Sequence, residues 1–222
     1  MKRILFLVAA AFTLFCSVQL SVNAKGDDDY KVILTLKDGK VINGYIRTSL
    51  MDGAMKVGVS ETPKGAYCEY ETKDIISLVY PALTEDQKEI LYVPCRAIKK
   101  VPNLISRRKE YKAPVLLRKI YEGEKLIGYV MPCVDATTNA TTTYYRNTYK
   151  YLYRVKGEEV AQPYWFASDG IVVGLKSAMK FIFKDYPEII EMFENGKIGR
   201  KEFLEHPEMI MPILNDVLVN RK

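Results

Sequence analysis

The sequence of 222 residues contains a single histidine, His206. A metal site built on several histidines is therefore excluded, and a Ser-His-Asp triad could form only around this residue. The sequence also lacks a glycine-rich phosphate loop and the G-x-S-x-G motif of a nucleophilic serine. We therefore predict no catalytic residue, no metal site and no cofactor.

Long apolar runs are absent except at the N-terminus, where Ile4 to Phe15 follow Lys2 and Arg3. Polar residues come next, and Val22-Asn23-Ala24 places small or modest side chains at positions −3 and −1 of a cleavage site. This order is typical of a cleavable secretory signal, and the apolar run is shorter than the ~20 residues that span a bilayer. We predict a signal peptide at residues 1–24, a secreted or periplasmic location and no transmembrane segment in the mature chain.

Cysteine is also scarce, with four residues in the chain. Cys16 would be the acylation site of a lipoprotein, but it follows the bulky Phe15, where lipidation signals have a small residue. Cleavage after residue 24 leaves Cys68, Cys95 and Cys133, which allow one disulfide with a free thiol or no disulfide. A small fold held mainly by disulfides is excluded, so a hydrophobic core must stabilise this one.

Residues 25–82 have the pattern of a small β-rich module. Apolar residues alternate with polar ones from Val32 to Leu36, Asp38-Gly39 predicts a hairpin turn, and residues 41–46 form the returning strand. A second pair of strands is expected at 54–59 and 66–71, and a fifth strand at 74–80.

Residues 83–112 are expected to connect two parts of the chain. Thr84 and Gln87 have the spacing of a capping box, which predicts a short helix running to about Leu91. Residues 96–119 contain nine lysines and arginines but a single acid, Glu110. We interpret the first two-thirds of this segment as a linker. This linker is either simply solvated or a contact site for an anionic polymer or lipid headgroups, through Arg107, Arg108 and Lys109.

Residues 113–222 are expected to form an α+β domain. A hairpin at 115–120 and 125–131 precedes a strand at 144–156, in which aromatic and basic side chains alternate. The aromatic face, with Tyr149, Tyr151 and Tyr153, is either core beneath the helices or a platform that stacks on sugar rings. Lys150 and Arg154 on the other face are expected to be solvated. The strand at 162–166 should pair back onto this one.

Three helices are expected after Gly174, at about 175–186, 187–195 and 207–219. The predicted fold class is therefore α+β: a small N-terminal antiparallel β module, then an antiparallel sheet packed with about three C-terminal helices. The strings Gly44-Tyr45-Ile46 and Gly128-Tyr129-Val130 follow Gly39 and Gly123 at equal spacing. They indicate either a diverged repeat or the shared chemistry of hairpins.

Several strings resemble those of a group of uncharacterised secreted bacterial proteins. LTLKDGKVINGYIRT (34–48) is similar to their opening V-T-x-x-D-G-x-x-x-x-G-Y-I strand pair, and KDIISLVYP (73–81) to the strand that closes that module. RKIYEGEKLIGYV (118–130) and KFIFKDYPEIIEMFENGKI (180–198) also resemble this group. The resemblance implies an exported protein with this order of elements, and it implies no activity or site residue. The long basic segment departs from the pattern.

The leading functional hypothesis is an exported, non-enzymatic protein that binds or scaffolds another component of the cell envelope. Its partner would be a glycan or an anionic polymer, whereas export argues against nucleic acid. The alternative is a glycan-binding or glycan-active enzyme that uses a carboxylate pair.

Overall fold

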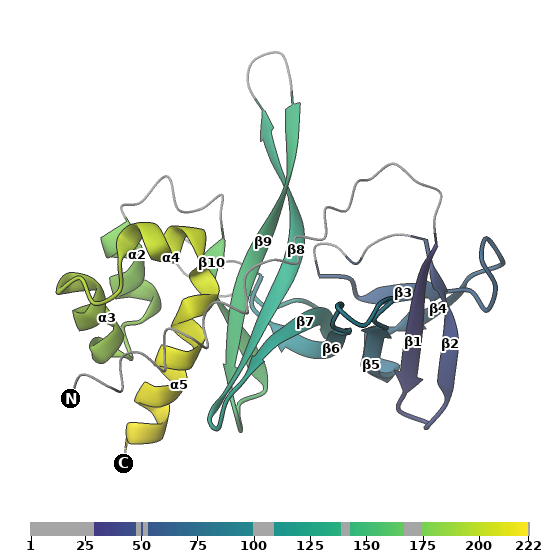
Figure 1. The fold of residues 1–222 in the computed structure, drawn as a ribbon, viewed down its shortest axis with the longest axis horizontal. Coiled ribbons are helices and arrows are strands. Elements are labelled where there is room, and N and C mark those ends of the chain that lie inside the picture. The colour runs from purple at the N-terminus through teal and green to yellow at the C-terminus, as the bar shows by residue number, and fades with distance from the viewer. Residues whose placement is uncertain are drawn as a thin grey trace.

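The computed structural model describes residues 29–47, 50, 53–99, 109–138, 143–166 and 175–221. The elements in chain order are β1 (Tyr30–Leu36), β2 (Val41–Ile46), β3 (Lys56–Val59), β4 (Cys68–Glu71), η1 (Thr72–Asp74), β5 (Ile75–Tyr80), β6 (Ile90–Ala97), β7 (Val115–Glu122), β8 (Leu126–Thr138), β9 (Thr143–Val155), β10 (Val160–Phe166), α2 (Leu175–Ile182), α3 (Pro187–Glu194), α4 (Arg200–Glu205), η3 (Pro207–Met209) and α5 (Ile210–Asn220). They confirm the α+β class. Figure 1 shows the helices at one end of the molecule and β1 to β4 at the other.

Eight strands form one sheet in the order β10-β9-β8-β7-β6-β5-β1-β2, and β3 pairs with β4 in a second, two-stranded sheet. The predicted N-terminal hairpins are confirmed. Gly39 takes a φ of +88° in the turn between β1 and β2, a conformation that glycine adopts without strain. β5 pairs with β1 on one side and with β6 on the other. The strands expected in residues 25–82 and those expected in residues 113–222 therefore belong to the same sheet.

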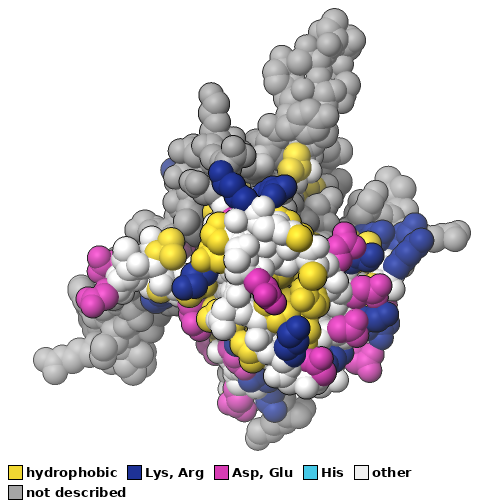
Figure 2. Space-filling model, turned by 90° about the vertical axis from the view of Figure 1, so that its right-hand side faces the viewer, with side chains coloured by type: hydrophobic (Ala, Val, Ile, Leu, Met, Phe, Trp, Pro, Cys, Tyr) yellow, Lys and Arg dark blue, Asp and Glu magenta, His cyan; other side chains and the backbone are white. Residues whose placement is uncertain are grey.

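The small sheet packs against the end of the large one. The β3–β4 hairpin contacts β2 through two backbone hydrogen bonds between Tyr45 and Ser60, of 2.8 and 2.9 Å. Apolar side chains from β1 to β3 and from β5 to β7 form a core between the two sheets. Val32 and Leu34 of β1 and Leu78 of β5 are among them. On the outer surface of this end, hydrophobic side chains occur in small groups separated by charged ones (Figure 2).

The predicted helix at residues 84–91 is wrong. Residues 84–87 form a turn, in which the Gln87 amide donates to the Thr84 carbonyl at 3.1 Å and the Leu83 amide donates to the Gln87 side chain at 3.3 Å. The residues that follow form β6, which pairs between β5 and β7. Arg96, which we placed in the linker, therefore lies in a strand.

Strands β6 to β10 follow one another antiparallel, and β10 then returns to β6 in parallel, with Val160 opposite Arg96 and Ala161 opposite Ala97. The sequence had suggested a purely antiparallel sheet. The parallel pair makes the sheet mixed. A ring of five strands results, and side chains such as Leu117, Tyr129 and Leu152 fill its interior. Closing the ring buries the inward face of every strand that contributes to it.

Four α-helices cover the outer face of β8 to β10 in the described C-terminal region, one more than predicted. The additional helix is α4, whose six residues are anchored by the buried Phe203. Met179 of α2 and Phe183 in the turn after it are buried in one apolar cluster with Tyr164 and Ile189. None of the described helices is long and apolar enough to cross a membrane.

Candidate functional site

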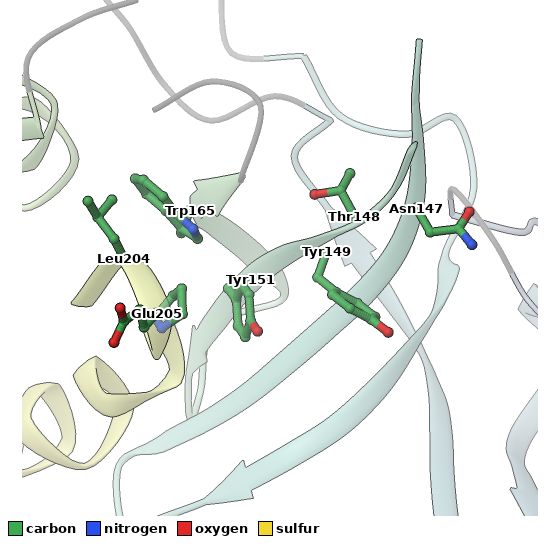
Figure 3. Close-up of a pocket in the computed structure, with 8 residues that line it drawn as sticks. Asn147, Thr148, Tyr149, Tyr151, Trp165, Leu204 and Glu205 are labelled. Carbon is green, nitrogen blue, oxygen red and sulfur yellow. The ribbon is translucent and has the colours of Figure 1, made fainter. Parts of the chain in front are cut away.

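A pocket of about 320 Å³ lies where β10 ends beside β9. The register pairs Phe166, the last residue of β10, with Lys150. The part of β9 before Lys150 thus extends past the end of β10, and α4 with the residue that opens η3 borders the space. The lining residues are Asn147, Thr148, Tyr149, Tyr151, Trp165, Leu204, Glu205 and Pro207 (Figure 3).

Aromatic rings supply much of this pocket. Tyr149 is 46% exposed, Tyr151 is half-buried, and Trp165 is almost fully buried, with its ring edge-on to Phe203 at a centroid distance of 5.2 Å. Tyr149 and Tyr151 belong to β9 and Trp165 to β10 (Figure 3). Burial raises the pKa of the Tyr151 hydroxyl, and the nearby Glu208 carboxylate raises it further. The hydroxyl therefore stays protonated and can serve as a hydrogen-bond donor.

The wall formed by α4 and η3 is fixed to the sheet. The buried Tyr164 hydroxyl donates to the Pro207 carbonyl at 3.0 Å, while the His206 amide caps α4 by donating to the Glu202 carbonyl at 2.8 Å. His206 Nδ1 lies 3.5 Å from a Glu208 carboxylate oxygen. The single histidine thus occupies the junction of the two helices, and Leu204 and Glu205 are held at the edge of the pocket.

The structure separates the three tyrosines that the sequence grouped together. Tyr149 and Tyr151 line the pocket, but Tyr153 is only 6% exposed and packs among the rings of Tyr164 and Tyr186 beneath the helices. Burial therefore differs between the two ends of one strand. Its inner end is core, and its outer end is an accessible aromatic surface.

The expectation that the basic face of β9 is solvated is wrong for Lys150, which is 7% exposed. The physical reason is ring closure, because the face opposite the tyrosines points into the interior formed by β6 to β10. Arg154 on the same face is half-buried, and its Nε atom is buried without a hydrogen-bond partner. Neither cation could be recognised as interior from a period-two pattern alone.

Of the predicted anionic-surface residues, Arg107 and Arg108 lie outside the described residues. Lys109 is exposed, and its carbonyl accepts a hydrogen bond of 2.8 Å from the Lys99 amide. Arg96 forms ion pairs with Glu110 at 2.8 Å and Glu159 at 2.6 Å. Part of the positive charge of this segment is therefore neutralised by acids from the segment itself and from the turn before β10.

Glu205 is the one carboxylate in the pocket lining, whereas glycoside hydrolysis ordinarily requires two. Cys68, Cys95 and Cys133 are all free thiols, with Cys95 and Cys133 buried inside the ring. Burial raises the pKa of the Cys95 thiol, which makes it a poor nucleophile.

No pattern in the sequence indicated that Tyr149 would share a pocket with Trp165, Leu204, Glu205 and Pro207. Trp165 is the single tryptophan of the chain, and its rarity was the one signal that could have drawn notice to it. Comparison with models of protein families, with curated proteins and with solved structures finds no match to this chain.

Proposed function

We propose that the chain is an exported, non-enzymatic binding protein of the cell envelope, and that the pocket beside Tyr149 holds a sugar ring of an envelope glycan. The observation that carries this proposal is the Tyr149 ring, 46% exposed at the edge of a pocket that also contains Trp165. An aromatic ring left in water is an available partner for the apolar C–H face of a sugar.

The remaining lining residues supply the polar contacts that a sugar requires. Glu205 accepts hydrogen bonds from ring hydroxyls, and the Asn147 amide both donates and accepts. A few polar groups around an apolar floor are typical of small-ligand sites, where they orient a ligand held mainly by apolar contact. The pocket volume of about 320 Å³ lies at the lower end of such sites and suits one or two rings.

The single tryptophan makes the site directly observable. Trp165 lines the pocket, so selectively excited tryptophan fluorescence should change in a saturable way when soluble peptidoglycan or polysaccharide fragments are titrated into the purified protein. Tyr149→Ala should weaken binding by about tenfold, the effect of losing ~1.4 kcal/mol of stacking.

The matched control is Tyr30→Ala, since Tyr30 is also exposed but lies in β1 at the other end of the sheet. Equal affinities for the wild type and Tyr149→Ala would exclude the glycan pocket. Hydrolysis of a glycan that disappears in Glu205→Gln would instead support an enzyme.

A further inference from the structure

Lys150 occupies an unusual position for an ammonium group. It lies on the inward face of β9, directly opposite Met131 of β8 and Phe166 of β10, and it is 7% exposed. Its Nζ donates to the Lys99 carbonyl at 2.7 Å and lies 5.2 Å from the centre of the Phe166 ring. No carboxylate of the described residues forms an ion pair with it, although buried charges are ordinarily paired.

A second donor lies on the same face of the same strand. Thr148 precedes Lys150 by two residues, so their side chains project to the same side of β9. Thr148 is 4% exposed, and its hydroxyl oxygen is buried without a hydrogen-bond partner. A buried hydroxyl without a partner is costly, and such groups in native structures call for an explanation.

A second cation lies close to these two groups. Lys99 Nζ lies 5.2 Å from the centre of the Tyr111 ring, and the Tyr111 hydroxyl contacts the Met131 sulfur at 3.9 Å. The Lys99 carbonyl accepts from the Lys150 ammonium, so the backbone of Lys99 lies beside Lys150 at this end of the ring. Glu110, whose backbone is bridged to Ile98 next to Lys99, forms an ion pair with Arg96. This end of the ring therefore carries positive charge and spare donors without a described carboxylate to match them.

We infer that this end of the ring is a binding site for a small oxyanion such as a phosphate group, with the Lys150 ammonium and the Thr148 hydroxyl as its donors and Lys99 as a second cation. A bound oxyanion would neutralise the buried charge and accept hydrogen bonds from donors that the protein leaves unused. The site lies on the opposite face of β9 from Tyr149 and does not depend on glycan binding. The same chemistry fits free phosphate and a phosphomonoester.

The probes are inorganic phosphate and glycerol phosphate, titrated by calorimetry into the full exported protein, with sodium chloride at equal ionic strength as the reference. The wild type should bind at least one of the two with a dissociation constant on the order of millimolar or tighter and should melt at a higher temperature in its presence. Tighter binding of glycerol phosphate would indicate that the natural ligand is a phosphate group of a polymer or lipid headgroup. Tighter binding of inorganic phosphate would indicate that the natural ligand is the free ion.

Lys150→Met keeps an unbranched apolar stem and removes the charge, so it should abolish binding while leaving the melting temperature without phosphate unchanged or raised. Thr148→Val is nearly isosteric and should weaken binding by about tenfold. Because Thr148 also lines the glycan pocket, the glycan control is made with Lys150→Met, whose side chain is outside that lining and which should retain the tryptophan response to glycans. The control is Lys156→Met, which removes a cation just beyond the other end of β9.

Binding that persists in both Lys150→Met and Thr148→Val would overturn the inference, as would a wild type that responds to phosphate no differently than to chloride. If Lys150→Met fails to fold, Thr148→Val alone decides between these outcomes, since it only replaces one hydroxyl with one methyl group.

Discussion

Replacing Gly44 by alanine tests how the two sheets are joined. A Cβ at Gly44 would lie 2.5 Å from the Ser60 carbonyl oxygen and 2.6 Å from Val59 Cγ1. The Val59 side chain can rotate, but the Ser60 carbonyl is backbone and accepts the 2.8 Å hydrogen bond from the Tyr45 amide. Making room for the methyl group therefore requires moving β3 away from β2.

The expected cost follows from these contacts. Overpacking of this kind costs about 1–3 kcal/mol, and weakening the two Tyr45–Ser60 hydrogen bonds costs up to about 1 kcal/mol each. Replacing a strand glycine returns about 0.5–1 kcal/mol, because alanine restricts the unfolded chain. We expect Gly44→Ala to lose about 2–3 kcal/mol of unfolding free energy, or roughly 4–12 °C in melting temperature for a protein of this size.

The matched control is Gly58→Ala in β3. A Cβ there would meet the nearest atom of Tyr67 at 3.6 Å, an ordinary van der Waals contact, so this change should be neutral or stabilising by up to about 1 kcal/mol. Urea unfolding of both variants beside the wild type measures the difference. Equal stability of Gly44→Ala and Gly58→Ala would refute the idea that close contact of β3 requires glycine at position 44.

Three further predictions concern other parts of the chain. Tyr153→Ala should lose about 3–5 kcal/mol of unfolding free energy through lost burial and a cavity, and Tyr149→Ala less than about 1 kcal/mol; equal losses would contradict their different burial. The Lys64 amide that donates to Asp29 holds the pKa of that carboxyl below its usual 3.8, so Asp29 stabilises the fold above this pH and loses that effect as the pH falls through the lowered pKa. Asp29→Asn should therefore have a lower urea midpoint than the wild type at about pH 7 and a smaller deficit at about pH 3, whereas an equal deficit at both would exclude this linkage. The intact mass of exported protein should correspond to cleavage after Ala24, and a mass for an acylated chain beginning at Cys16 would show a lipoprotein instead.

Local sequence patterns predicted the hairpins well because their determinants lie within a few residues. Asp38-Gly39 specifies the turn between β1 and β2, where the Lys40 amide donates to the Asp38 side chain at 2.9 Å. The predicted helix at 84–91 failed because Thr84 and Gln87 form an isolated turn, in which the Gln87 side chain accepts from the Leu83 amide and not from the Thr84 amide of a capping box. The apolar residues from Ile90 onward lie instead in β6, which pairs with β5 and β7.

The repeated Gly-Tyr strings have a structural explanation that a single sequence does not show. Gly44 lies where β3 approaches β2, and Gly128 lies beneath the Met211 side chain of α5. Both glycines thus give another element room to pack closely on a hairpin. A close approach of another element is thus common to both glycine positions.

The candidate site was largely beyond prediction because its parts are distant in the sequence. The alternation in residues 144–156 correctly indicated a strand with an aromatic face, but nothing in it separates Tyr149 from Tyr153. That difference depends on where β10 ends and on where α4 is anchored. With six residues, α4 is too short to show an apolar stripe in the sequence. Lys150 is likewise buried only because β10 returns to β6.

The parallel pairing of β10 with β6 also bears on how the chain reaches this structure. Each antiparallel pair from β6 to β10 can form as soon as two consecutive strands are available, but the last pairing must wait for all five. Until Val160 and Ala161 dock beside Arg96 and Ala97, β10 and the end of β6 that extends past its pairing with β5 are open edges that could pair with another chain. We expect ring closure to be a late step in folding, because contacts distant in the sequence form slowly. Chains that end before β10 should aggregate through the exposed edge of β6.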